Sequence, residues 1–426
     1  MVLKIYPAQS FAISAEKNIK FLVEHQCPQC GAPITLFETD KLVLCEFCRV
    51  KSYLKANGFF MYCLPSFAPP DKKLVYFPYW RFKGMLFACA DRKINHRFID
   101  LTHQAISSLY FPISTGLRTQ SLKLKYITPE TQGLFLKPVI SLNNVLKIFK
   151  NRFVHTLSKP IWHRAHIGET ISLIYSPFYV EKKVYDAVIN QPVSANLPDN
   201  FDLSGFNSQT TKGTIKFLPT LCPDCGWDLE GERDSLVLSC KNCKTSWQAS
   251  KDSFKKINTA HLKSKGENIL YLPFWRISSK IDGIKLNSYA NLVKIANLAK
   301  APQKEWEKKP FWFWCPAFKI RPKSFLRLAR SASVSLLPEK LISGMPVGSF
   351  NPTNLEVQEA IESLKLILAD FGAPRQPLWE KLSKIDIIAK KYLLVYLPFK
   401  EGHHDFVQPL LNVAINKNQL ALAKNL

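Results

Sequence analysis

Short runs of β-branched and aromatic residues alternate with turn-forming residues along much of the chain, and this pattern predicts strands. The clearest runs are 73–77, 171–175, 269–272 and 392–397. Each run leads into a proline, which lacks the amide hydrogen that a strand donates to its neighbour. We therefore expect these prolines to lie at strand ends, at sheet edges or at bulges.

A helical spacing of apolar residues is clearest in 354–371, and Gly372 can end that helix. A weaker pattern of the same kind covers 142–153, and a further helix is expected in 377–392. Strands therefore outnumber helices, and the expected fold class is α+β. The apolar face of the helix expected in 354–371 comprises Val357, Ile361, Leu364, Ile367, Leu368 and Phe371.

The chain contains the same series of segments twice, which indicates an internal duplication. Tyr-Phe-Pro-Tyr-Trp-Arg at 76–81 matches Tyr-Leu-Pro-Phe-Trp-Arg at 271–276. Two more aromatic–proline segments follow in each half, at 109–113 and 174–179 in the first and at 312–318 and 395–399 in the second. These six segments admit two interpretations, a buried sheet core or an exposed surface on which nucleobases stack beside an arginine.

Eight of the 11 cysteines form two matching sets of paired Cys-x-x-Cys motifs, and 14 residues separate the inner cysteines of each set. Two such turns can place four thiolates around one ion, for which zinc is the leading candidate and rubredoxin-like iron the alternative. Because cysteine fills all four positions, no ligand position is left for a substrate, so two structural Zn²⁺ ions are expected. The ligands are Cys27, Cys30, Cys45 and Cys48 in the first set and Cys222, Cys225, Cys240 and Cys243 in the second.

The Cys-Pro-x-Cys-Gly motifs at 27–31 and 222–226 resemble those of the zinc-ribbon superfamily. More loosely, the chain looks like bacterial proteins of unclear function that join such ribbons to Tyr-x-Pro-Phe-Trp segments and are sometimes labelled helicase-like. A phosphate-binding Gly-x-x-x-x-Gly-Lys-Ser/Thr loop is absent from the sequence, so a helicase motor is not supported. The resemblance implies zinc and leaves the function open.

These observations divide the chain into two repeats, each with a zinc ribbon followed by an antiparallel β-sheet that carries one or two packed helices. An N-terminal segment, 1–18, precedes the first repeat, 19–200, and a linker, 201–214, separates it from the second repeat, 215–426. The ribbons are expected at 19–55 and 215–250, and the β-rich α+β domains at 56–200 and 251–426.

Lysine and arginine outnumber aspartate and glutamate by 58 to 33, which gives a net charge of +25. A field of this size attracts nucleic acid, other polyanions and anionic membranes, although a lysine-rich solvated surface would give the same excess. Basic and aromatic residues near the motifs are the candidate contacts for such a partner. They are Arg49, Arg81, Lys244, Arg276, Trp312, Trp314, Arg321, Lys323, Arg327 and Arg330.

The sequence contains no recognised catalytic motif, and no apolar run approaches the length of a membrane-spanning helix. Charged residues interrupt the first 26 positions, so no signal peptide is expected. Metal-bound thiolates suit a reducing compartment, and we expect the protein in the cytoplasm. The expected function is non-catalytic binding of an anionic partner, with nucleic acid the leading candidate. The alternative is a protein–protein adaptor or scaffold, for which an anionic membrane surface is one possible location, and the oligomeric state stays open.

Overall fold

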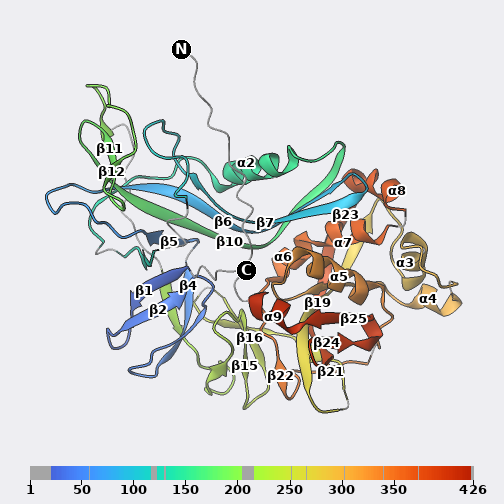
Figure 1. Ribbon diagram of the computed structural model, residues 1–426. Helices are drawn as coiled ribbons and strands as arrows, with labels where there is room; N and C mark the ends of the chain where they lie inside the picture. Colours follow the sequence, from blue (N-terminus) through green and yellow to red (C-terminus); the bar gives the residue numbers. More distant parts are fainter. Residues whose placement is uncertain are drawn as a thin grey trace.

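The computed structural model describes residues 21–423, apart from 57, 117–121, 129–130, 204–214, 251, 265, 302, 339 and 373. The expected N-terminal segment 1–18 lies outside the described residues, as does most of the expected linker 201–214. Strands dominate the fold, and most helices lie in the second half of the chain (Figure 1). The protein is therefore mostly β, with two large sheets and two smaller ones.

The first large sheet has ten strands and is built on two long ones, β6 (Val75–Ala90) and β10 (Ile161–Val180), which pair antiparallel. β7 (Lys93–Gln104) forms a hairpin with β6, and α2 (Leu142–Val154) packs against β6 (Figure 1). The shorter strands are β1 (Leu22–Gln26), β2 (Pro33–Phe37), β5 (Phe60–Cys63), β8 (Leu124–Tyr126), β9 (Leu134–Phe135), β11 (Val184–Asp186) and β12 (Gln191–Pro192).

The second large sheet has eight strands and is likewise built on an antiparallel pair, β19 (Ile269–Asp282) and β23 (Asp386–Glu401). Its other strands are β18 (Thr259–His261), β20 (Phe313–Pro316), β21 (Ile342–Ser343), β22 (Ser349–Phe350), β24 (Asp405–Gln408) and β25 (Val413–Asn416). The helices of this half are α3 (Tyr289–Ile295), α4 (Lys304–Lys308), α5 (Pro322–Val334), α6 (Val357–Glu362), α7 (Leu364–Phe371), α8 (Arg375–Trp379) and α9 (Lys417–Ala423).

The cysteine-bearing segments lie side by side and share a core. β13 (Ile215–Pro219), which precedes the second cysteine set, pairs antiparallel with β4 (Lys51–Ala56), which follows the first. β3 (Leu42–Leu44) completes that three-stranded sheet. The second ribbon adds a four-stranded sheet, whose strands are β14 (Leu229–Glu230), β15 (Val237–Cys240), β16 (Ser246–Ala249) and β17 (Phe254–Ile257).

The four prolines after the predicted strands lie inside β6, β10, β19 and β23, so the expectation of strand ends was wrong for them. On one side of β6, β9 pairs with the residues before Pro78 and β7 pairs with those after it. The carbonyl of Pro78 accepts from Ala105 N on that side, at 2.9 Å. The nitrogen of Pro78, which carries no hydrogen, therefore faces the gap between β9 and β7. No hydrogen bond between strands is lost there. Pro177, Pro273 and Pro398 occupy equivalent gaps.

The helix predictions had mixed outcomes. The pattern in 142–153 is confirmed by α2, and that in 354–371 is confirmed as α6 and α7. They meet at Ser363, whose hydroxyl donates to the carbonyl of Ala360 at 2.7 Å. The helix expected in 377–392 is wrong beyond α8, because Asp386 begins β23. The long partner β19 pairs with that stretch as far as Asp282, so tertiary pairing outweighs local propensity.

The aromatic rings of the matching motifs at 76–81 and 271–276 lie in the hydrophobic core, as one of the two sequence interpretations proposed. Phe77, Tyr79, Phe274 and Trp275 are each fully buried. In the first sheet, Phe77 stacks on Phe111 with ring centroids 4.3 Å apart. These rings therefore stabilise the sheets and are not surfaces for stacking bases.

Candidate functional site

The first cysteine set forms one compact cluster at the edge of the first ribbon. The Sγ atoms of Cys27 and Cys48 are 3.7 Å apart, as are those of Cys30 and Cys45. All four sulfur atoms lie within 4.8 Å of one another. Spacings of this size suit four thiolates around a single ion with metal–sulfur distances of about 2.3 Å.

The second set repeats this geometry. The Sγ atoms are 3.6 Å apart between Cys222 and Cys243, and 3.4 Å apart between Cys225 and Cys240. All four again lie within 4.8 Å of one another. The protein therefore has two four-cysteine clusters that could each bind a metal ion such as zinc, and both are consistent with zinc-ribbon-like sites.

The backbone of each Cys-x-x-Cys turn is held in shape by a residue in the left-handed region. Gly31 and Gly226 have φ values of +74° and +72°, and their amides donate to the carbonyls of the first cysteines. Arg49 and Lys244 follow the second turns with φ values of +58° and +56°. These two residues adopt a conformation that favours glycine, and both side chains are exposed beside the clusters.

The two clusters differ in their surroundings. The hydroxyl oxygen of Thr245 lies 2.9 Å from the Cys243 sulfur and accepts a hydrogen bond from the Trp247 indole nitrogen at 2.8 Å. In the first ribbon, the position two residues after the last ligand is Val50, which has no hydroxyl. A hydroxyl beside a ligating sulfur can stabilise its thiolate form. Sequence reasoning missed Thr245, although its offset from Cys243 could have revealed it.

Arg81 is not on the surface, so the expectation that it contacts a partner is corrected by its position. Its side chain is 1% exposed and pairs with the carboxylates of Glu38 and Asp100. Both oxygens of Asp100 accept from the guanidinium, each at 2.9 Å. A buried guanidinium bound by two carboxylates has a structural role.

Three other predicted residues meet in one pocket of the second half. The guanidinium carbon of Arg276 lies 4.2 Å from the ring centroid of Trp312 and 5.6 Å from that of Trp314. Trp314 is buried and Trp312 is partly buried. With Lys309 and Tyr289, they line a cavity of about 190 Å³. These three predicted partner contacts therefore share one cavity. 

The remaining predicted contacts lie on α5 or at its start. Arg321, Lys323 and Arg327 are exposed, whereas the helix buries its opposite face in the core. The guanidinium of Arg327 donates to the carbonyl of Ala414 at 2.6 Å, and that of Arg330 donates to the carbonyl of Asp370. The amphipathic pattern therefore describes a helix packed on the second sheet, with part of its charge bound to neighbouring carbonyls.

Two exposed aromatic residues on the cysteine turns were also missed. Phe47, between Cys45 and Cys48, is 69% exposed, and Trp227, next to Gly226, is 58% exposed. Their proximity to the ligands in the sequence was the available signal. Large apolar side chains on the surface are candidates for contact with a partner.

Across the described part of the chain, no helix has the length and apolar character needed to cross a membrane. A scan against protein-family models, a search of curated proteins and a search of solved structures each found no match to this chain.

Proposed function

We propose that this chain is a non-catalytic, zinc-stabilised binding protein for an anionic partner, with nucleic acid as the leading candidate. The observation that carries the proposal is the cavity formed by Arg276, Trp312 and Trp314 in a chain whose net charge is +25. Such a charge concentrates polyanions near the surface and makes their binding sensitive to salt.

The chemistry of this cavity suits an anion that carries oxygen acceptors. A guanidinium that stacks on an indole still directs its N–H groups outward in its own plane. They can therefore donate hydrogen bonds to an anion that lies beside the edge of the guanidinium. The indole nitrogen of Trp312 is buried without a hydrogen-bond acceptor among the described residues. A phosphate oxygen or a nucleobase carbonyl would satisfy that donor, and Lys309 would add positive charge.

A protein–protein adaptor is the second candidate, and the exposed apolar residues of the ribbons favour it. Leu44, Phe47 and Val50 are 58%, 69% and 40% exposed on the first ribbon. Leu221 and Trp227 are 52% and 58% exposed on the second. An adaptor of this kind would bind with weak salt dependence, because apolar contacts release few counterions.

We also propose that the α+β halves arose by duplication and that each cysteine cluster holds zinc. Matching hydrogen bonds support the duplication: the Trp80 indole donates to Ile140 O at 2.8 Å, and the Trp275 indole donates to Leu355 O at 2.9 Å. The parallel strands β9 and β22 occupy corresponding places beside β6 and β19. Thiolate ligation supports a reducing compartment, and we propose the cytoplasm.

The test is fluorescence anisotropy of labelled single-stranded RNA, single-stranded DNA and duplex DNA with the zinc-loaded chain. We expect binding at low salt that weakens steeply as salt rises. Trp312→Phe removes the indole donor and should weaken binding at least threefold. Lys280→Ala, on the same strand as Arg276 but paired with Asp282, removes a positive charge outside the cavity and should weaken binding less than Trp312→Phe does. Absence of any shift at low salt would leave the adaptor as the supported function.

A further inference from the structure

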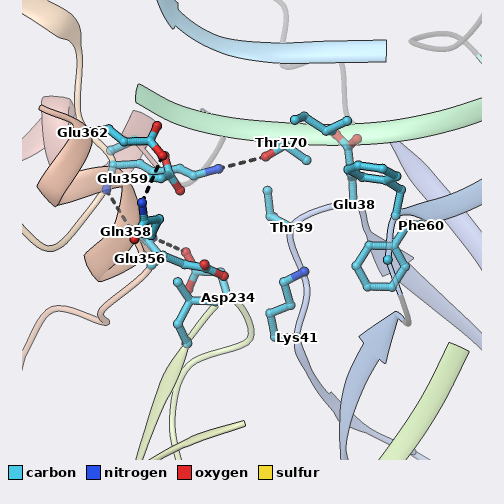
Figure 2. Close-up of a pocket in the computed structure, with 17 residues that line it drawn as sticks. Glu38, Thr39, Lys41, Phe60, Thr170, Asp234, Glu356, Gln358, Glu359 and Glu362 are labelled. Atoms are coloured by element: carbon cyan, nitrogen blue, oxygen red, sulfur yellow. Dashed lines mark hydrogen bonds between the residues drawn. The ribbon is translucent and has the colours of Figure 1, made fainter. Parts of the chain in front are cut away.

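A second cavity, of about 300 Å³, lies where the first ribbon, β10 and the second half meet. Figure 2 shows Thr39 and Lys41 on one side of it and Glu356, Glu359 and Glu362 on the other. The acidic side belongs to α6 and the residue before it. Chain segments far apart in sequence therefore form the two walls, which explains why no local motif predicted the cavity.

Charge in this cavity runs against that of the whole protein. Five carboxylates and two ammonium groups line it, so its lining has an excess of negative charge. The Lys319 ammonium is held by the hydroxyl of Thr170 at 2.9 Å. On the acidic side, Asp234 accepts from the amide of Asn354 at 2.6 Å. The carboxylates belong to Glu38, Asp234, Glu356, Glu359 and Glu362, and the ammonium groups to Lys41 and Lys319.

Two groups of opposite charge in this lining have incomplete sets of partners. The ammonium of Lys41 lies 4.4 Å from the ring centroid of Phe60, and none of the described residues accepts a hydrogen bond from it. Glu38 is 5% exposed; its Oε1 pairs with Arg81, but its Oε2 has no hydrogen-bond partner among the described residues. A buried oxygen without a donor is destabilising unless a ligand or water supplies one.

The environment of Lys41 favours an anionic ligand group beside it. Burial is the main cause that lowers the pKa of Lys41, to about 8, and the charge of Lys319 acts in the same direction. Glu356 and Glu38 oppose this shift only in part. A carboxylate placed against Lys41 would stabilise the ammonium form.

We infer that this cavity binds a small cationic amino acid of the arginine type, which carries a carboxylate as well as its positive groups. Its carboxylate contacts Lys41, and its cationic end faces Glu356 and the neighbouring acidic residues. A guanidinium fits this wall because its planar array of donors can serve more than one carboxylate at once. This ligand differs in charge and place from the polyanion proposed for the Arg276 cavity.

Isothermal titration calorimetry of the zinc-loaded full chain with three related compounds tests the inference. L-arginine carries both charged ends, agmatine lacks the carboxylate, and L-citrulline has a neutral side chain of nearly the same shape. We expect L-arginine to bind at least tenfold more tightly than either analogue. No heat with L-arginine at millimolar concentration overturns the inference, as does equal binding of agmatine.

Variants then locate the site. Lys41→Met and Glu356→Gln should each weaken L-arginine binding at least tenfold, whereas Lys280→Met should leave it unchanged. Glu356 is exposed, so its variant remains informative if Lys41→Met fails to fold. Unchanged affinity in Glu356→Gln contradicts the assignment. Trp312→Phe should not alter L-arginine binding, which separates this result from failure of the polyanion proposal.

Discussion

The guanidinium of Arg233, on the second ribbon, contacts the carboxylate of Asp40, on the first, with 2.6 Å between Nη2 and Oδ2. Asp40 is 3% exposed in its side chain, and its carboxylate also accepts from the amide of Phe37 at 2.8 Å. The backbone carbonyl of Arg233 accepts from the amides of Lys41 and Leu42. The two ribbons are therefore joined by side-chain and backbone contacts as well as by the pairing of β13 with β4.

Removing this contact should loosen the junction of the ribbons. Burial is the largest influence on the pKa of Asp40 and raises it, while the positive charge of Arg233 works against that rise. Arg233→Ala leaves the carboxylate buried without its cation, and we expect a loss of about 1–2 kcal/mol in the free energy of unfolding. Chemical denaturation measures it. Lys256→Ala, which breaks an exposed pair with Asp224, is the control and should change stability by under about 1 kcal/mol.

Replacing one ligand in either cluster should remove one metal ion and leave the other. Cys27→Ser and Cys222→Ser each break a four-thiolate set, and the local fold depends on that set. Elemental analysis should find two zinc ions per chain in the parent and one in each variant. Cys89→Ala, a buried cysteine outside the clusters, should retain two. Iron in place of zinc, or two ions in both ligand variants, would contradict this expectation.

The hydroxyl of Thr245 should increase the affinity of the second cysteine cluster for its metal ion. Thr245→Val removes the group that lies against the Cys243 sulfur, and such outer contacts affect metal affinity by about 10-fold or more. In competition with a chromogenic chelator, Thr245→Val should lose zinc from one of its two sites faster than the parent does. Val50→Thr, at the corresponding place in the first ribbon, should leave the second site unchanged, and equal zinc loss in both variants would argue against a specific effect.

How far the sequence predicts this protein depends on how local each signal is. The cysteine clusters were predictable because each pair of ligands comes from one tight turn. The full lengths of β6 and β23 were not, because pairing with β10 and β19 sets them. Arg81 was misplaced since one partner, Glu38, lies 43 residues away in sequence. The cavity around Lys41 and Glu356 left no trace, because unrelated segments supply its walls.

His163 should make the protein less stable as the solution becomes acidic. It pairs with Cys89 across β10 and β6, and its Nε2 atom is buried without a partner among the described residues. Burial lowers its pKa to about 4, and the charge of Lys365 adds to the shift. In the unfolded chain the pKa is about 6.5. The unfolded state therefore binds a proton more readily between these values, so the stability that the neutral buried His163 allows is complete above pH 6.5 and is lost as pH falls toward 4.

Unfolding by guanidinium chloride at pH 7.5 and pH 5.0 should show a smaller decrease in stability for His163→Phe than for the parent. Because acid also protonates the cysteine ligands in both proteins, the difference between the two decreases is the measurement, and identical decreases would exclude His163 as the cause.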